Sequence, residues 1–494
     1  MDFALNEEQL EFKARCRKFA REVIRPVARK HDREESTPWE AIKEARRQGF
    51  GGLEAIQRNA SDPEGQMQVI SAEEFHWGCA GIALAISGSG LAAAGIASSG
   101  TPEQMQRWVP ECFGAGEEIK LGAYAVTEPQ AGSDVKSLKT TAKRDGDEWV
   151  LNGTKVFITN GGIADVHVVV ATVDPELGTR GQASFVVAKG TPGLSQGKKE
   201  TKLGIRASHT AEIVLEDCRV PAENLLGGEE KLEKKLQRGR EGKKSRGADA
   251  LATFEITRPL VGASALGIAQ AAYEWTLEYL HGQSEGGVPM LKQQRIQQTL
   301  ADVATEIEAA RLLVQRAAWM GRNGIPMTGG QGSMSKLKGG DVTMWATTTL
   351  MDLVGPYAQS TDCPLEKWFR DAKIYQLFEG TAEIQRMVIS RMQARDYAER
   401  LGYAAEIAEE TMKKEPVGLR QVLSSDRCTD RAGIATRVRR TRGDRTAGGG
   451  WGWRWRSTSG SSEPRRSAVS SPDRWRCSPT PGTCSPTSAR SSSP

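Results

Sequence analysis

Apolar residues recur every three to four positions through residues 1–120, which is the spacing of helices that bury one face. The first helix should begin after Asn6, a capping residue, with acidic residues in its first turn. Its buried face is predicted to comprise Phe12, Cys16, Phe19, Val23 and Val27. Further on, Thr101-Pro102-Glu103-Gln104 is typical of a capping box with proline at the first helical position. Residues 1–120 therefore predict an N-terminal helical domain.

From residue 121 the pattern changes to short, β-branched, alternating runs at residues 141–159, 166–173, 183–190 and 211–220. Pairs such as Asp145-Gly146 and Asn152-Gly153 are typical of the turns between strands. Residues 121–226 therefore predict a middle β domain, a sandwich or barrel.

Helical spacing returns after a charged segment at residues 227–247, which we interpret as a solvated helix or loop. Two apolar series mark buried helix faces: Ile296, Leu300, Val303 and Ile307, and Trp345, Leu350 and Leu353. Residues 248–414 predict a C-terminal helical bundle, so the fold class is α+β and mainly helical.

Beyond residue 414 the composition shifts to Arg, Gly, Ser, Pro and Trp without aliphatic periodicity, which predicts a disordered tail over residues 415–494. Its abrupt start also resembles translation of a GC-rich gene in the wrong frame. The formal net charge of the 494 residues is +5, but residues 421–494 hold fourteen Arg, no Lys and five acidic residues, which leaves −4 for residues 1–420. That body has no basic stripe for nucleic acid or membrane.

The start of the chain lacks the charged, apolar and cleavable segments of a secretory signal. The small apolar stretch at residues 80–98 is interrupted by Ser and Gly, unlike a membrane span. Eight Cys are scattered without metal-ligand spacing. We therefore expect a cytoplasmic protein without a metal site.

The most informative stretch, residues 370–387, places one carboxylate, Glu379, between an aromatic-aliphatic run and a predicted helix. Three neighbours could keep water from it and raise its pKa towards that of a general base: Tyr375, Leu377 and Phe378. Gly380 allows close backbone approach, and Thr381 can open a helix. On this stretch alone, a general base and a helix-start glutamate are equally good interpretations.

A second motif, residues 124–134 (YAVTEPQAGSD), follows a strand with hydroxyl and backbone N–H groups that suit a polar cofactor ring and a phosphate. A simple turn between strands explains it equally well. Together with VFITNGG at residues 156–162 and IYQLFEGTAEIQ at residues 374–385, however, it resembles the acyl-CoA dehydrogenase family of flavoproteins over residues 3–400. The resemblance implies an N-terminal helical domain, a middle β domain and a C-terminal four-helix bundle, with FAD between domains and across a subunit interface.

The resemblance also implies roles for single residues. Residues expected to lie on FAD are Tyr124, Val126, Thr127, Ser133, Phe157, Ile158, Thr159, Thr381 and Glu383. Phe157 replaces the family's usual Trp, and Thr159 should hydrogen-bond near the reactive flavin nitrogen. Residues expected to touch substrate are Ser133, Glu255, Arg258 and Gly380.

Glu379 matches the family's catalytic base, which would remove the α-proton of an acyl-CoA as hydride passes to FAD. The product would be a trans-2-enoyl-CoA, and an electron-transfer flavoprotein would reoxidise the FAD. Some members carry the base at the position of Thr257, which cannot serve, so Glu255 is the alternative base.

Departures from the family pattern concern the cofactor. Gln283 stands where a partner subunit usually supplies an arginine to the FAD pyrophosphate, and Asp352 and Pro356 replace Gln and Gly of an FAD loop. We expect either a homotetramer in which Arg295 or Lys292 serves the phosphate, or a hetero-oligomer with a related subunit. Two other functions stay open: a half-site or non-catalytic subunit, and a DNA-associated flavoprotein that uses the Arg-rich tail.

Overall fold

The computed structural model describes residues 4–116, 118–242 and 249–400, without the side chains of residues 249–256 and 400. The predicted tail, and residues 401–414 of the predicted bundle, lie outside the described residues. The N-terminal helices are α1 (Glu7–Phe19), α2 (Arg25–Glu34), α3 (Trp39–Arg47), α4 (Gly52–Ser61), α5 (Met67–Gly78), α6 (Ala80–Ser87), α7 (Ser89–Ser99) and α8 (Pro102–Glu111). Both predicted capping boxes, at Asn6 and Thr101, are present.

One expectation for the first helical segment is wrong. Between α1 and α2 the backbone makes a π-helical turn, Ala20–Ile24. Such a turn inserts one extra residue into the helical repeat and rotates the buried face by one position. Ile24 and Ala28 are therefore buried, whereas the predicted Val23 and Val27 are only partly buried.

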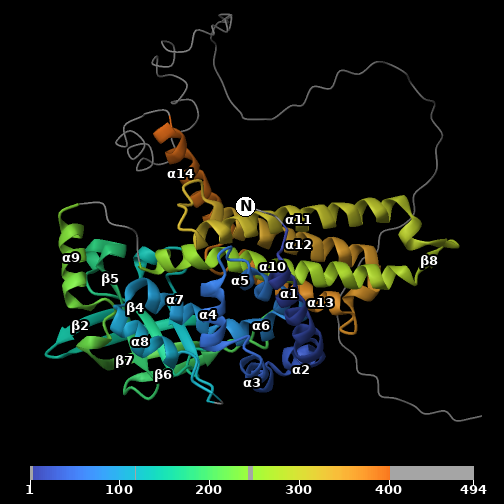
Figure 1. The fold of residues 1–494 in the computed structure, drawn as a ribbon. Coiled ribbons are helices and arrows are strands. Elements are labelled where there is room, and N and C mark those ends of the chain that lie inside the picture. The colour runs from blue at the N-terminus through green and yellow to red at the C-terminus, as the bar shows by residue number, and fades with distance from the viewer. Residues whose placement is uncertain (1–3, 117, 243–248, 401–494) are drawn as a thin grey trace, which may run out of the picture. The chain divides into compact units, whose positions relative to one another are not determined.

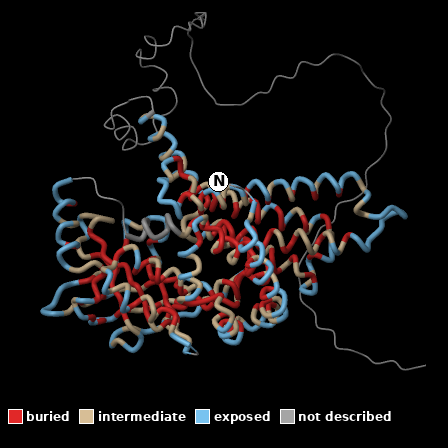
Figure 2. The backbone as a smooth tube through the Cα atoms, viewed as in Figure 1, coloured by how far each residue is buried: buried red, intermediate tan, exposed pale blue. Residues whose placement is uncertain are grey.

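The middle domain is a seven-stranded sheet whose path runs β1-β4-β2-β3-β7-β6, with β5 paired to β4. Its strands are β1 (Gly122–Ala125), β2 (Thr141–Asp145), β3 (Glu148–Thr159), β4 (Val166–Thr172), β5 (Gln182–Ala188), β6 (Leu194–Lys199) and β7 (Thr210–Pro221). Every residue of β4 is buried. One face of the sheet packs against α7 and α8 through Tyr124 and Val168. Figure 2 shows many buried positions in the interior of this part of the chain.

Two local predictions in this domain need correction. Asn152-Gly153 is not a turn, because β3 runs on through it and only shifts register against β7, between Leu151 and Gly153. Asn152 instead bonds Asp217 across the sheet. The strand β6 was not predicted, since its polar sequence on the edge of the sheet carries no apolar alternation.

The C-terminal part is helical (Figure 1). It contains α10 (Asp249–His281), α11 (Gln294–Arg322), α12 (Gln331–Val354), α13 (Pro364–Ala372) and α14 (Ala382–Arg400), and it is preceded by α9 (Gly228–Arg240) in the charged segment. A small hairpin, β8 (Ser284–Glu285) and β9 (Val288–Pro289), joins α10 to α11. Short 3₁₀ turns lie at Val135–Ser137, Pro175–Gly181, Ala222–Asn224, Met290–Lys292, Gly355–Gln359 and Lys373–Gln376.

Glycines let the long helices α10 and α12 cross closely. A Cβ on Gly339 would lie 2.9 Å from the Cα of Gly262 on the facing helix. The predicted apolar faces are buried at Ile296, Ile307 and Leu350, but Trp345 is 40% exposed. Trp345 lines a surface cleft between α11 and α12 instead of the core.

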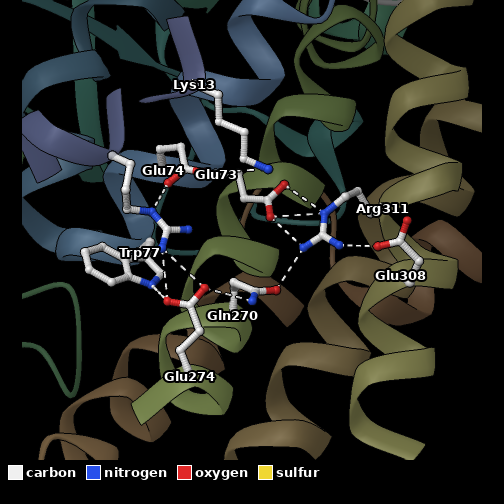
Figure 3. Close-up of polar contacts among 9 residues, drawn as sticks. Lys13, Glu73, Glu74, Trp77, Gln270, Glu274, Glu308 and Arg311 are labelled. Atoms are coloured by element: carbon white, nitrogen blue, oxygen red, sulfur yellow. Dashed lines mark hydrogen bonds and ion pairs between the residues drawn. The ribbon is translucent and has the colours of Figure 1, made fainter. Parts of the chain in front are cut away.

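A cluster of polar side chains joins the N-terminal helices to the bundle (Figure 3). We call it the interdomain cluster; it comprises Arg17, Glu73, Glu74, Trp77, Gln270, Glu274 and Arg311. Arg311 binds Glu73 at 2.7 Å, and Arg17 bridges Glu74 and Glu274. The charges are paired across α1, α5, α10 and α11, so the N-terminal helices are fixed to the bundle that carries Glu379.

No single helix in the described ranges has the length and apolar composition to cross a membrane; one bent pair, Ala80–Ser87 with Ser89–Ser99, passes by length and composition only.

Candidate active site

Glu379 lies in the five-residue loop, residues 377–381, between the 3₁₀ turn Lys373–Gln376 and α14. Its φ is +52° and that of Gly380 is +92°, so both residues adopt the left-handed conformation. Gln385 Nε2 donates to the carbonyls of Glu379 (3.0 Å) and Gly380 (3.2 Å). The φ of +92° favours glycine at position 380, and a Cβ there would lie 2.4 Å from Gln385 Nε2, which would have to move. Thr381 caps α14 by accepting from the Ile384 N–H at 3.3 Å, as predicted.

The Glu379 carboxyl is held by groups from two other helices. Desolvation raises its pKa, while a hydrogen bond and two cations act in the opposite direction. The hydrogen bond is donated by Thr257 Oγ1 of α10 to Glu379 Oε2, at 2.6 Å. The cations are Lys336 of α12 and Arg258 of α10. Glu379 keeps part of its surface accessible, which a base needs in order to reach a substrate.

The predicted shield of Glu379 is only partly correct. Tyr375 is fully buried, with Phe378 edge-on at 5.0 Å and His76 edge-on at 5.9 Å. Leu377, by contrast, is 46% exposed. Leu377 lies just beyond the 3₁₀ turn, which ends at Gln376, and its side chain is open to solvent.

The motif at residues 124–134 combines core and surface positions. Tyr124 and Val126 are buried, and a Cβ on Gly95 of α7 would lie 2.6 Å from the Tyr124 ring. Thr127 is partly buried and Ser133 is exposed, so of the four residues expected on the cofactor these two offer accessible hydroxyls.

Phe157 has the features of a platform for a planar ring. It lies at a register shift of β3, between Lys155 and Ile158, with a φ of +58°. Its ring is 65% exposed, whereas Val156 and Ile158 on either side are buried. Backbone in this region is sparsely populated and persists only where the surrounding structure holds it, often at a functional site. Phe157 and, two residues on, Thr159 are the residues of this motif whose side chains a ligand could reach.

Sequence reasoning missed the ion pair that joins these two β-domain motifs. Lys155 Nζ binds Glu128 Oε1 at 2.7 Å and the carbonyl of Val126 at 2.9 Å, with both charged side chains fully buried. Glu128 also accepts from the N–H groups of Lys139 and Thr140. Glu128 therefore fixes the loop that follows β1. The sequence did not predict this ion pair, because Glu128 and Lys155 are 27 residues apart and no local pattern links them.

The other predicted residues differ in how far they are buried. Arg258 is buried and donates to Ser333 Oγ at 3.2 Å. Glu383 is exposed in the first turn of α14. Gln283 and Asp352 are also exposed. The side chain of Glu255 lies outside the described residues.

Arg295 and Lys292, the two residues that could take over the FAD phosphate, are both exposed. Lys336 was missed altogether, because a single lysine in a helical pattern is usually solvated.

Three family models match the chain along nearly the whole described length. They are the acyl-CoA dehydrogenase N-terminal domain at residues 6–115, the middle domain at 123–218 and the C-terminal domain at 246–393. The chain belongs to the acyl-CoA dehydrogenase family. It is accordingly an oxidoreductase of the acyl-CoA dehydrogenase class, and FAD is the cofactor of that family.

Several named proteins have similar sequence identity to this chain. The chain is 40% identical over 394 residues to the acryloyl-CoA reductase (NADH) of Anaerotignum propionicum, covering 79% of this chain and 95% of that protein. It is 37% identical to a short-chain specific acyl-CoA dehydrogenase of Clostridium acetobutylicum, covering 79% and 99%. The solved butyryl-CoA dehydrogenase of Megasphaera elsdenii matches with a TM-score of 0.70 and 36% identity, covering 79% and 99%.

Proposed function

We propose that this acyl-CoA dehydrogenase removes the α-proton of an acyl-CoA thioester with Glu379, giving the trans-2-enoyl-CoA. The observation that carries the proposal is the Glu379 carboxyl itself, which is desolvated, partly accessible and held by Thr257 at 2.6 Å. A base of this kind needs a pKa above that of a solvated carboxylate, because proton transfer is most efficient when the pKa lies near the working pH.

Different residues of the chain would remove the proton, orient the base and hold its loop in place. Glu379 takes the proton, and Thr257 fixes its side chain in one orientation by a charge-assisted hydrogen bond. Gln385 fixes the loop by holding two consecutive carbonyls. FAD, when bound, supplies the acceptor for the β-hydride, and Phe157, Thr159 and the Thr127 hydroxyl are the accessible β-domain groups that would hold it. Glu255 is kept as the alternative base.

The relatives favour a short acyl chain and an electron-transfer flavoprotein as the electron acceptor. The matched proteins include a butyryl-CoA dehydrogenase, and a further solved chain belongs to a structure described as the electron transferring flavoprotein of Acidaminococcus fermentans, with a TM-score of 0.71 and 35% identity. A panel of acyl-CoA esters from butyryl to palmitoyl, assayed with an artificial electron acceptor, tests the reaction and the chain length together. If none of these esters is turned over, the proposed function is wrong.

A second candidate, a half-site subunit of a hetero-oligomer, is favoured by Gln283 and Asp352 in place of cofactor contacts. Loss of one charge-assisted hydrogen bond, worth about 1.5 to 3 kcal/mol, lowers FAD affinity roughly tenfold to a hundredfold. Bound FAD per protomer, measured on the chain purified alone and again after Gln283→Arg, separates the two. Full occupancy before the substitution favours the homo-oligomer, and occupancy only after it favours the hetero-oligomer.

A further inference from the structure

Lys336 of α12 is a buried cation that the proposed reaction does not use. Its side chain is 1% exposed, and its ammonium donates to the carbonyl of Gly380 at 2.7 Å. Within the part of the chain that the structure describes, no carboxylate makes an ion pair with it. Burying an ammonium group without such a partner is costly, so a purely structural role would be served better by an apolar side chain.

The groups that face Lys336 come from three helices and the Glu379–Gly380 loop. Desolvation lowers the pKa of Lys336 to about 8. Glu379, Asp341 and Glu383 favour its charged form, and Arg258 opposes it. The effect of Glu379 is reciprocal, because the positive charge of Lys336 in turn lowers the pKa of the Glu379 carboxyl.

The hydrogen bond and the charge of Lys336 can be told apart. Gln385 Nε2 donates to the same Gly380 carbonyl, at 3.2 Å, and is neutral. Loss of the Lys336 ammonium therefore leaves that carbonyl with one donor, and the loop keeps its second anchor on Glu379. What no neutral donor replaces is the positive charge beside a desolvated carboxylate.

We propose that Lys336 is a positioning residue for Glu379: it holds the Gly380 carbonyl and supplies the positive charge that keeps the neighbouring carboxylate ionised. The inference rests on the proposed function for its catalytic meaning, since a base must be deprotonated before it takes a proton. Together with the Thr257 hydrogen bond, Lys336 offsets part of the desolvation of Glu379, and so extends to lower pH the range in which Glu379 can act.

The first test is the titration of Glu379 in the full chain labelled with ¹³C at the glutamate carboxyl, assigned by the signal lost in Glu379→Gln. In Lys336→Met the pKa of Glu379 should rise by about one unit or more, the usual effect of losing a nearby opposite charge. Lys336→Arg should return it towards the wild-type value, because the charge is kept. The matched control is Lys338→Met: this lysine lies on the same helix but pairs with Glu306, so its loss should leave the Glu379 titration unchanged.

A second measurement does not depend on the stability of Lys336→Met. Coupling between two titrating groups is reciprocal, so the near-isosteric Glu379→Gln should lower the pKa of Lys336, followed by the ¹³Cε shift of labelled lysine, by the same amount. An unchanged Lys336 titration in Glu379→Gln, or an unchanged Glu379 titration in Lys336→Met, overturns the inference.

The two proposals fail separately. If both titrations shift but Glu379→Gln keeps full turnover, Glu379 is not the base, whereas the coupling to Lys336 stands. If Glu379→Gln abolishes turnover and neither titration shifts, the base is confirmed and Lys336 has only a structural role.

Discussion

Two groups of charged residues in this molecule are built in opposite ways. In the interdomain cluster, Arg311 meets Glu73 and Arg17 meets both Glu74 and Glu274 in direct ion pairs (Figure 3). At the proposed active site, Lys336 bonds a backbone carbonyl and the Glu379 carboxyl bonds a hydroxyl. Direct pairing fixes charges and cancels them, whereas the looser arrangement leaves a carboxylate able to exchange a proton.

The backbone is regular at the interdomain cluster and strained at the proposed active site. The interdomain cluster rests on the regular helices α1, α5, α10 and α11. Glu379 and Gly380 are both left-handed, a conformation that costs a non-glycine residue about 1 to 3 kcal/mol. Strain at Glu379 is tolerated because Gln385, Lys336 and Thr257 hold the loop from three directions. We therefore expect substitutions in the interdomain cluster to change stability and substitutions at the Glu379–Gly380 loop to change catalysis.

The largest effect is expected for Glu379→Gln. The amide keeps the shape and can still bond Thr257, but it cannot accept the α-proton, so kcat should fall roughly 10²- to 10⁴-fold. Melting temperature and bound FAD should stay near the wild-type values. Glu255→Gln is the control, and a larger loss of turnover there would move the base to Glu255.

Arg311→Met should change stability and leave the chemistry intact. It leaves Glu73 with an unpaired charge in a mostly buried site, which typically costs about 3 kcal/mol or more in free energy of unfolding. Chemical denaturation measures this loss, and turnover per folded protein should not change. Adding Glu73→Leu should recover most of the stability, because apolar pairs often replace buried ion pairs without loss. A double variant as unstable as the single one contradicts this account.

Thr257→Val should have an intermediate effect, confined to the pH profile. The hydrogen bond from Thr257 favours the ionised form of Glu379 and so lowers its pKa. Its removal should raise that pKa further, because the ionised form loses a hydrogen bond. The acidic limb of the kcat/KM profile should therefore move to higher pH while the plateau at high pH stays. A profile that does not move would show that Thr257 does not bond the carboxylate in the working enzyme.

The smallest effect is expected for Lys43→Ala. Lys43 and Glu40 form an ion pair at 2.9 Å, but both side chains are well exposed to solvent on α3. Water and salt screen such a pair, so its loss should be within the error of a denaturation experiment. A measurable loss of stability would show that exposed ion pairs contribute more to this protein than screening by water and salt allows.

Much of the fold could be predicted from the sequence because its signals are local. Capping at Asn6 and Thr101, the buried face of α11 and the β-branched run of β4 each depend on residues a few positions apart. The errors arose where a local rule met an irregular backbone. The π turn at Ala20–Ile24 moved the buried face, and β3 continues through Asn152-Gly153, with a shift of its register against β7, where a turn was expected.

The sequence by itself determined the class of the protein, the domain order and the candidate base, because those depend on motifs that are contiguous in the chain. Only the tertiary structure decided what surrounds the base. Thr257 is 122 residues from Glu379 in the sequence, and Lys336 is 44 residues from Gly380, whose carbonyl it binds. The pKa of Glu379 is set by desolvation and by charges across those distances, and both fall steeply with separation in space. No spacing along the chain encodes them, so they arise only when α10, α12 and the Glu379–Gly380 loop pack together.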